Sequence, residues 1–378
     1  MNTPQGGPQY WPGENVSSIL SNAQLSQDDP NHRAFCMALK LAYTTLPHAE
    51  PPAYVAHLPS TLEDTAKDCL QRVGRFTAGL QNGPAISMAM NTTSDFPLVV
   101  QEATNIFLRN SYDEEPSPLQ YGLAKRVLTP DFKGVNRVAV GGRSTLEEVN
   151  ENGEFKYGSF VEEGGTIYKL HTYGNILSVS RQLLFNGGVR ALERIGQDQG
   201  RVIRRFEADK LAKMLNDNPV IYDGKTLFHA DHNNLGEPGA LTVENLSNAR
   251  LAMRRQVDVD GKTPINIRPK ILLIDPSNET VAQQLTAALT PGQSEHVNPF
   301  SYLQVIVEPR LTEGDWYLIA PFPQAEGLEY SYLGSQPGPE FRSDAPLDYD
   351  GFRYRIRLDF GCGWADWRGW YKVPAVEN

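Results

Sequence analysis

The chain has 378 residues, and at roughly 150 residues per domain this length allows two to three domains. Hydrophobic residues make up 40% and charged residues 21%, which is ordinary for a soluble protein, and the length excludes a peptide-scale or metal-dependent mini-fold. Its 45 Asp and Glu outnumber 35 Lys and Arg, for a formal net charge of -10. This balance argues against a protein whose whole surface grips nucleic acid, although an acidic average can hide a basic face.

The cysteines and the terminus indicate the compartment. Cys36, Cys69 and Cys362 are odd in number, far apart and without CxxC spacing, which predicts free thiols in a reducing cytoplasm. The first 20 residues lack a basic region followed by an apolar run, so no secretory signal is visible. No stretch approaches 18 uninterrupted apolar residues, and we expect no membrane span.

The N-terminal region is predicted to be helical after a flexible start. Residues 1 to about 25 are polar and carry too little apolar surface to offset the entropy of ordering. Apolar residues at helical spacing predict a helix within residues 26–43. After the Pro-rich segment 47–59, Ser60 and Glu63 form a predicted capping box for a second helix.

Glycine and proline divide the region that follows. The segment from Gly79 to Pro84 is expected to close the N-terminal unit. A third helix is expected to start near Ser94 or Asp95, with Pro97 in its first turn.

Residues 120–180 are predicted to form two long strands that extend away from the rest of the chain. The β-rich runs Val135–Val140 and Thr166–Ser180 flank a polar, Glu-rich stretch from Gly141 to Gly165. This segment has no core of its own, and an isolated hairpin is marginal in water. Such an arm therefore needs a partner.

The longest predicted helix runs from about Gly188 to Asn216, about 45 Å at 1.5 Å per residue. Its apolar residues form a narrow predicted stripe of Leu192, Ile195, Val202, Phe206 and Met214. Seven basic residues oppose four acidic ones, a local charge of +3. Gly196 and Gly200 each cost roughly 1 kcal/mol against Ala, which favours either a close backbone approach or a mild bend.

Residues 220–345 predict an α+β or α/β domain of about 120 residues. Helices are expected over Val243–Gln256, capped by Thr242, and over Ser277–Leu289. Four short apolar runs fit strands: Lys270–Ile274, Leu303–Val307, Trp316–Ala320 and Leu328–Leu333.

The clearest predicted strand comes last, over 352–360. Its apolar residues alternate with Arg353, Arg355, Arg357 and Asp359, so that one face is apolar and the other carries cations. The tryptophans that follow, Trp364, Trp367 and Trp370, fit core packing or the burial of an edge of the domain.

Three tripeptides copy parts of nucleotide-binding motifs. The segments 223–226 and 260–263 contain Gly-Lys-Thr, but Pro219 and Gln256 stand where a phosphate-binding loop needs its first glycine. Both segments therefore predict Asp-Gly turns. The tripeptide 359–361 copies a kinase metal-binding motif without the rest of the kinase signature, and predicts the end of a strand.

His229 and His232 suggest a possible metal site, with Asp223 and Asp231 nearby. They lie in a predicted loop between Gly224 and Gly236, and the helix that would hold two imidazoles on one face is absent. A hydrogen-bonded turn is the favoured interpretation. The alternative function is a metal-dependent hydrolase centred on these two histidines.

Short segments in chain order resemble the major head subunit of Mu-like tailed phages, a family with the Hong Kong 97-type major capsid fold. These segments are Thr92-Thr-Ser-Asp-Phe-Pro97, Phe155-Lys-Tyr-Gly158, Tyr173-Gly174, Ser180-Arg-Gln182, Leu227-Phe-His-Ala-Asp-His-Asn-Asn-Leu235, Ala252-Met-Arg254, Asp260-Gly-Lys262, Arg268-Pro269, Trp316-Tyr-Leu318, Arg357-Leu-Asp-Phe-Gly361 and Asp366-Trp-Arg-Gly369. The resemblance covers about residues 91–372, and its specificity comes from ordered agreement at many points.

The resemblance implies an α+β chain with an N-terminal arm, an extended β-hairpin loop, a long spine helix, and peripheral and axial domains. The implied divisions are a scaffold-like or extended segment (1–90), an N-arm (91–128), the extended loop (129–180), the peripheral domain with the spine helix (181–220), the axial domain (221–345) and the return strand of the peripheral domain (346–378). The first segment is too short for the maturation protease to which family members are often fused.

The function that the resemblance implies is structural, with no enzymatic activity, catalytic residue, metal or cofactor. Copies would form hexamers and pentamers, close into an icosahedral shell and enclose double-stranded DNA, in the host cytoplasm before assembly and in the virion capsid afterwards. Further implied partners are the portal, the scaffold, the maturation protease and a decoration protein, with no membrane. Cross-linking through Lys133, Lys156 or Lys169 is known in the fold, but no feature marks a Lys–Asn pair.

Charged residues on the loop, the long helix and the last strand are the expected assembly interface. We expect the cations to supply either subunit contacts or a modest attraction on the inner face of a shell. The candidates are Glu147, Glu148, Glu154, Lys156, Arg194, Arg201, Arg204, Arg205, Arg353, Arg355 and Arg357.

Overall fold

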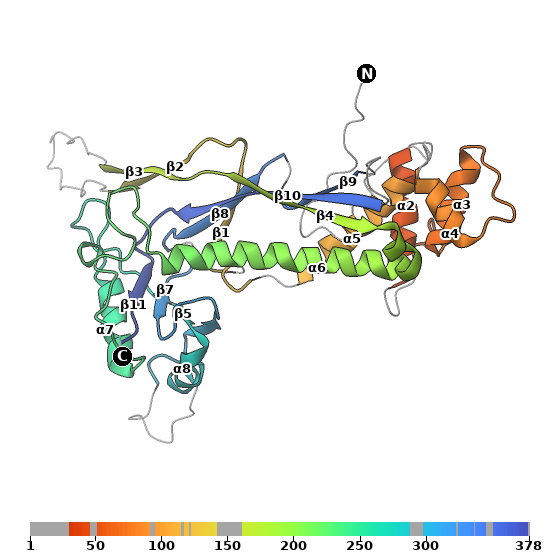
Figure 1. Ribbon diagram of the computed structural model, residues 1–378. Coiled ribbons are helices and arrows are strands. Elements are labelled where there is room, and N and C mark those ends of the chain that lie inside the picture. Colours follow the sequence, from red (N-terminus) through yellow and green to blue (C-terminus); the bar gives the residue numbers. More distant parts are fainter. Residues whose placement is uncertain are drawn as a thin grey trace. The chain divides into compact units, whose positions relative to one another are not determined.

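The computed structural model describes residues 30–45, 51–90, 95–114, 117–120, 122–141, 161–287, 298–322, 324–335, 337–344 and 351–376 (Figure 1). The chain divides into two compact units. Unit 1 comprises Met1–Pro116, Thr172–Phe206 and Leu333–Phe360, and unit 2 comprises Ser117–His171, Glu207–Tyr332 and Gly361–Asn378. Helices and several sheets occur together, so the expected α+β class is confirmed.

The described helices are α2 (Pro30–Tyr43), α3 (Leu62–Arg72), α4 (Asn82–Met90), α5 (Phe96–Glu114), α6 (Arg181–Asn216), α7 (Val243–Arg254) and α8 (Glu279–Thr286). The strands are β1 (Lys125–Thr129), β2 (Val135–Gly141), β3 (Val161–Tyr168), β4 (His171–Ser180), β5 (Ile271–Ile274), β6 (Gln304–Val307), β7 (Trp316–Ile319), β8 (Leu328–Leu333), β9 (Glu340–Asp344), β10 (Gly351–Trp364) and β11 (Trp370–Val373). Short 3-10 turns are η1 (Ala230–His232) and η2 (Pro276–Asn278).

The N-terminal helices of unit 1 form a packed group. Helix α2 contributes eight buried residues and packs against α5, and Arg33 forms an ion pair with Asp95 at 3.2 Å just before α5 begins. Pro97 lies in the first turn of α5, as predicted. Helix α2 therefore contributes to the core of unit 1.

Two expectations for this region are wrong. Helix α3 is capped by Thr61, whose hydroxyl accepts a hydrogen bond from the Asp64 backbone N–H, and not by Ser60. The segment expected to end the N-terminal unit instead enters α4, with Pro84 near its start, because proline is tolerated in the first turn of a helix.

Unit 1 contains an antiparallel ribbon of β9 and β10, with β4 on the other side of β10. The predicted alternation in the last strand is confirmed, since Tyr354, Ile356 and Leu358 are buried. The Thr172 hydroxyl donates to Asp359 at 2.6 Å, which places the even residues of β4 on the same face as the arginines of β10. Tyr173 therefore lies on the buried face.

Helix α6 covers that buried face in unit 1. The Tyr173 ring lies 4.6 Å from the ring of Phe206, and α6 runs alongside β4 (Figure 1). The helix is broken at Gly188, where φ is 53° and ψ is -140°, so its long segment starts where the sequence predicts. Of the predicted apolar stripe, Leu192 is buried, but Val202 is exposed and that part of the prediction is wrong.

The close-approach interpretation of the α6 glycines is confirmed. A Cβ on Gly196 would lie 2.6 Å from Phe107 Cβ, and one on Gly200 would lie 2.6 Å from the Leu108 carbonyl oxygen. Helices α5 and α6 therefore approach each other backbone to backbone within unit 1.

Unit 2 contains a four-stranded sheet in the order β11-β7-β5-β6. Strands β5 and β6 are parallel, with Leu272 opposite Val305, whereas β5 with β7 and β7 with β11 are antiparallel. All four expected strands of this region are present, and α7 is capped by Thr242 as predicted. The other expected helix starts as the turn η2 and continues as α8. Side chains from α7, α8 and the sheet share one core.

The hairpin of unit 2 consists of β2 and β3, paired antiparallel with a bulge beside Val135. The expected single run Thr166–Ser180 is wrong, since β3 ends at Tyr168 and β4 begins at His171. The acidic stretch between the strands, residues 142–160, lies outside the described residues. Strand β1 lies beside β8 in the same unit.

Both predicted Asp-Gly turns are present, with Gly224 at φ 80° and Gly261 at φ 66°. In the second turn, Asp260 accepts hydrogen bonds from the Thr263 hydroxyl at 2.6 Å and from the Thr263 and Lys262 backbone N–H groups at 2.8 Å. These bonds, the Thr263 hydroxyl first, lower the pKa of Asp260 to about 2.

Asp260 should therefore stay ionised to lower pH than an ordinary aspartate. An NMR titration should place its pKa at about 2, and Thr263→Ala should raise that pKa toward the usual value. Because the folded-state pKa is depressed, its contribution to stability is present above pH 4 and is lost as the pH falls through 2. An unchanged pKa in the Thr263→Ala protein would contradict this role for the hydroxyl.

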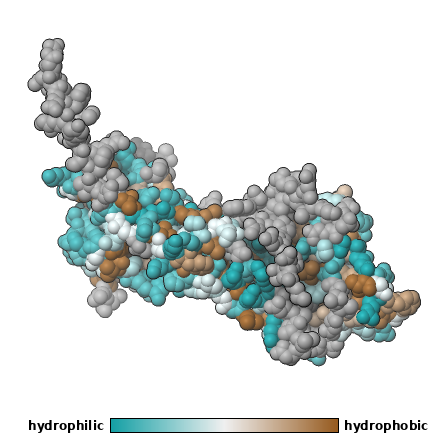
Figure 2. Space-filling model, turned by 90° about the horizontal axis from the view of Figure 1, so that it is seen from above, coloured by the Kyte–Doolittle hydropathy of each residue, from teal (hydrophilic) through white to brown (hydrophobic). Residues whose placement is uncertain are grey.

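All three cysteines are buried and free, as predicted. Among the described residues, no helix combines the length and the apolar character needed to cross a bilayer. Large exposed hydrophobic side chains are scattered along the chain, and on the coloured part of the face in Figure 2 they form small groups among hydrophilic residues.

Candidate functional site

The root of the β2–β3 hairpin is held to the body of unit 2 by a buried carboxylate. Glu329 of β8 is 1% exposed and accepts two hydrogen bonds from the Arg137 guanidinium, at 2.7 and 3.1 Å. The Tyr168 hydroxyl donates a third at 2.7 Å. The two strands of the hairpin thus share one buried anion, and burial raises the pKa of Tyr168 above its usual value.

A second ion pair fixes β3 at the same root. Arg368 is buried and donates to Glu163 at 2.8 Å, to Asp366 at 3.0 Å and to the Val257 carbonyl at 3.2 Å. Its guanidinium also lies 4.5 Å from the Trp367 ring. Partly buried charge pairs with this many hydrogen bonds restrict geometry, so they orient the hairpin strongly.

Glycine allows the strands to approach at this root. A Cβ on Gly164 would clash with the Arg137 carbonyl oxygen and lie 2.7 Å from Val138 Cα. We therefore define the anchor of the hairpin as Arg137, Glu163, Tyr168, Glu329 and Arg368. Sequence patterns do not predict this anchor, because its charged partners are up to 205 residues apart.

The candidate metal residues are fixed by the protein itself. His232 is buried, with Nδ1 3.0 Å from the Leu227 carbonyl oxygen and Nε2 2.7 Å from Asp223 Oδ2. Its ring stacks on Trp367 at 4.2 Å. Burial raises the pKa of Asp223, but hydrogen bonds from His232 and the Lys225 backbone outweigh it, and the pKa is lowered overall.

His229 is held by a local backbone contact. Its Nδ1 accepts a hydrogen bond from the Asp231 backbone N–H at 3.1 Å and caps η1. The described residues contain no cluster of three or more His, Cys, Asp or Glu side chains able to hold a metal ion. The segment is a hydrogen-bonded turn, the interpretation that the sequence favoured.

The α6 arginines divide into two kinds. Arg204 donates through Nε to the Tyr112 carbonyl oxygen, and its guanidinium lies 3.7 Å from the Tyr112 ring centre. It therefore joins α6 to α5 within unit 1 and is unsuited to an intermolecular contact. Arg194, Arg201 and Arg205 are exposed.

The β10 arginines lie on the face of the ribbon opposite the core. Arg357 pairs with Glu340 at 2.6 Å, and Arg342 pairs with the same carboxylate at 2.5 Å. In the strand register Arg355 lies directly opposite Arg342. Like charges directly opposite each other are destabilising, and here the Glu340 carboxylate compensates the charge of Arg342.

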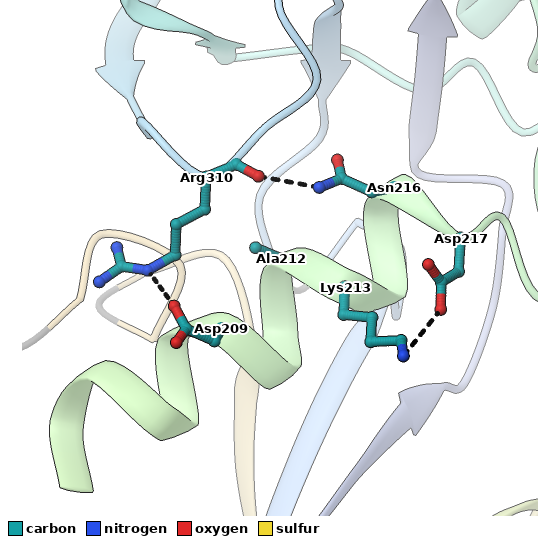
Figure 3. A pocket seen from close by; sticks show the side chains of 6 residues that line it. All are labelled: Asp209, Ala212, Lys213, Asn216, Asp217 and Arg310. Atoms are coloured by element: carbon teal, nitrogen blue, oxygen red, sulfur yellow. Dashed lines mark hydrogen bonds and ion pairs between the residues drawn. The ribbon is translucent and has the colours of Figure 1, made fainter. Parts of the chain in front are cut away.

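The expected loop residues Glu147, Glu148, Glu154 and Lys156 lie outside the described residues. An open hollow of about 240 Å³ occurs elsewhere in unit 2 (Figure 3), lined by Asp209, Ala212, Lys213, Asn216, Asp217 and Arg310. Its charges are paired with each other, Arg310 with Asp209 at 2.6 Å and Lys213 with Asp217 at 3.6 Å. The hollow therefore offers no unpaired charge among its lining side chains to select a ligand.

A family model described as phage capsid protein matches residues 162–373, more than half of the chain. The chain belongs to the phage capsid protein family. The matched range takes in β3 except for its first residue, the whole of α6, and Glu329 and Arg368 of the hairpin anchor. No curated protein matches this capsid protein in sequence.

Several solved structures are similar to the capsid protein at low sequence identity. A chain of Gordonia phage Cozz is 12% identical with a TM-score of 0.46, covering 68% of this chain and 85% of that one. A chain from the capsid of the native GTA particle is 10% identical with a TM-score of 0.45, covering 67% and 89%. The SrpI encapsulin of Synechococcus elongatus PCC 7942 is 12% identical with a TM-score of 0.43, covering 68% and 85%. These TM-scores lie below 0.5, so the family assignment rests on the sequence match.

Proposed function

We propose that this capsid protein is the major head subunit of a tailed phage, with the Hong Kong 97-type arrangement of elements. Its copies form hexamers and pentamers that close into an icosahedral shell around double-stranded DNA. The observation that carries the proposal is the family match over residues 162–373. The protein is a structural component, without enzymatic activity, that gathers in the host cytoplasm and ends in the virion capsid.

The β2–β3 hairpin serves in this proposal as the extended loop that reaches over a neighbouring subunit. The anchor supports this role, because it fixes the root of the hairpin while β2 leaves Val138 59% exposed. An anchored root with an unpaired outer face is suited to lie on another chain. Glu147, Glu148, Glu154 and Lys156 would then contact the neighbour.

The arginine face of β10 is the proposed contact between subunits. Arg353, Arg355 and Arg357 lie on the same face of the ribbon, and Arg355 opposes Arg342. An acidic side chain of a neighbouring copy would relieve the repulsion between the last two.

The N-terminal helices are proposed to belong to the head subunit itself. Helix α2 buries eight residues in its packing against α5, so the loss of α2 would expose a large apolar surface. The divisions at 1–90, 91–128, 129–180, 181–220, 221–345 and 346–378 stay predictions. Portal, scaffold, maturation protease and decoration protein are proposed partners during assembly.

Electron microscopy of the expressed full chain tests the proposal. We expect shells, capsomers or tubes, because a major head subunit associates with itself. A compact monomer at high concentration would contradict the proposal. The geometry does not support the competing hydrolase hypothesis, because both ring nitrogens of His232 already contact protein oxygens.

A further inference from the structure

Four arginines form a straight exposed row on α6. Successive residues of an α-helix are rotated by about 100°, so Arg190, Arg194, Arg201 and Arg205 fall within an arc of about 60° on one side. All four are exposed and belong to unit 1. At 1.5 Å per residue the row is about 22 Å long.

The row points away from the described residues of α5 and β4 that α6 packs against in unit 1. Gly196 and Gly200 face α5, and Phe206 faces the Tyr173 ring of β4. Around the helix these contacts lie roughly opposite the row. None of these described contacts therefore covers the row.

Few groups within the described residues neutralise the row. Arg201 has a loose pair with Asp198, 3.8 Å apart, and that aspartate is 66% exposed. Glu193 accepts a hydrogen bond from Gln197 at 3.3 Å. The row therefore presents a net positive line of guanidinium groups.

We propose that this arginine row binds the backbone phosphates of duplex DNA, without regard to sequence. Guanidinium groups match phosphate oxygens with two parallel hydrogen bonds, and a row of about 22 Å spans roughly six base pairs at 3.4 Å each. The inference deepens the proposed function, on which it rests, by assigning α6 to the DNA-facing side of the shell.

An acidic protein neighbour is a poorer fit to the same surface. Protein interfaces are centred on buried apolar or aromatic side chains. Between Arg190 and Arg205 the exposed side of α6 is polar, apart from Val202 at its edge. A phosphate backbone, in contrast, needs only regularly placed cations.

DNA binding by the arginine row is compatible with the net charge of -10 of the whole chain. Four phosphate contacts in one subunit give weak, salt-sensitive binding, and many copies together hold the genome by multivalency. Such binding orders DNA near the wall without holding any segment tightly.

The test measures the salt dependence of binding by unassembled full-length protein to a 20-base-pair duplex of arbitrary sequence. Four phosphate contacts predict a slope of about -3.6 for log K against log salt, a loss of about 150-fold between 50 and 200 mM. The double variant Arg201→Gln/Arg205→Gln should halve the slope to about -1.8, a loss of about 12-fold. The matched control, Arg268→Gln/Lys270→Gln, removes the same charge from exposed side chains of unit 2 and should keep the original slope.

Thermal unfolding and electron microscopy of each variant separate the possible outcomes. If both double variants fold and assemble but give equal slopes, the α6 row does not bind DNA. Loss of assembly in the α6 variant with an unchanged DNA slope would identify the row as a subunit contact and overturn the inference. Wild-type protein that binds DNA with the expected slope but never associates would overturn the proposed function and leave the row as a DNA-binding surface.

Discussion

Replacing Arg137 with methionine should destabilise unit 2 by about 3 kcal/mol, because Glu329 would be left buried without a countercharge. Urea unfolding followed by tryptophan fluorescence measures this loss. The method suits the question because four tryptophans, Trp316, Trp364, Trp367 and Trp370, belong to unit 2.

Two further variants test the explanation. Lys125→Met breaks the exposed ion pair with Glu326, 3.2 Å apart, and should change the free energy of unfolding by less than about 0.5 kcal/mol. The double variant Arg137→Met/Glu329→Met should recover most of the stability, because it removes the buried charge together with its partner. A loss below about 1 kcal/mol in Arg137→Met would show that Glu329 is not held by Arg137.

Gly196→Ala should destabilise unit 1 by about 1 to 3 kcal/mol, because the added methyl has no room between α6 and α5. It would lie 2.6 Å from Phe107 Cβ and 2.8 Å from the Thr104 carbonyl oxygen. Hydrogen exchange of peptides from α5 reports the effect directly, since those amides should exchange faster when the two helices are forced apart.

The control is Val202→Ala on the exposed side of α6, where the side chain is 48% exposed. Surface substitutions in a helix change stability little, so this variant should stay within about 0.5 kcal/mol of the wild-type free energy of unfolding. Destabilisation by Gly196→Ala alone would confirm the close approach. An unchanged or higher free energy of unfolding in Gly196→Ala would refute it.

The elements with strong local signals could be predicted from the sequence. The alternation of Arg353, Arg355 and Arg357 with apolar residues gave the central strand, and Gly188 marked the start of the long segment of α6. The hydrogen-bonded turn that contains His229 and His232 followed from their Gly-rich surroundings. In each case neighbouring residues alone carry the information.

The features that were missed depend on distant partners. Glu207 and Glu329 are buried, although a glutamate in isolation predicts an exposed position. Glu207 is satisfied by Gln120 at 2.7 Å and Tyr332 at 2.9 Å, which are 87 and 125 residues away. Sequence patterns over short windows do not contain such pairings. The arginine row of α6 was partly visible as local charge, but only the helix geometry separates Arg204 from its exposed neighbours.

The hairpin anchor also has a consequence for the order of folding during synthesis. The partner of Arg137 is Glu329, which is synthesised 192 residues later, and the partner of Glu163 is Arg368, which is synthesised 205 residues later. Contacts this distant in sequence form late, after most of the chain has left the ribosome. A chain that ends before residue 368 lacks Arg368 and cannot complete the anchor. Only a subunit synthesised to that point can therefore hold its hairpin in a fixed position.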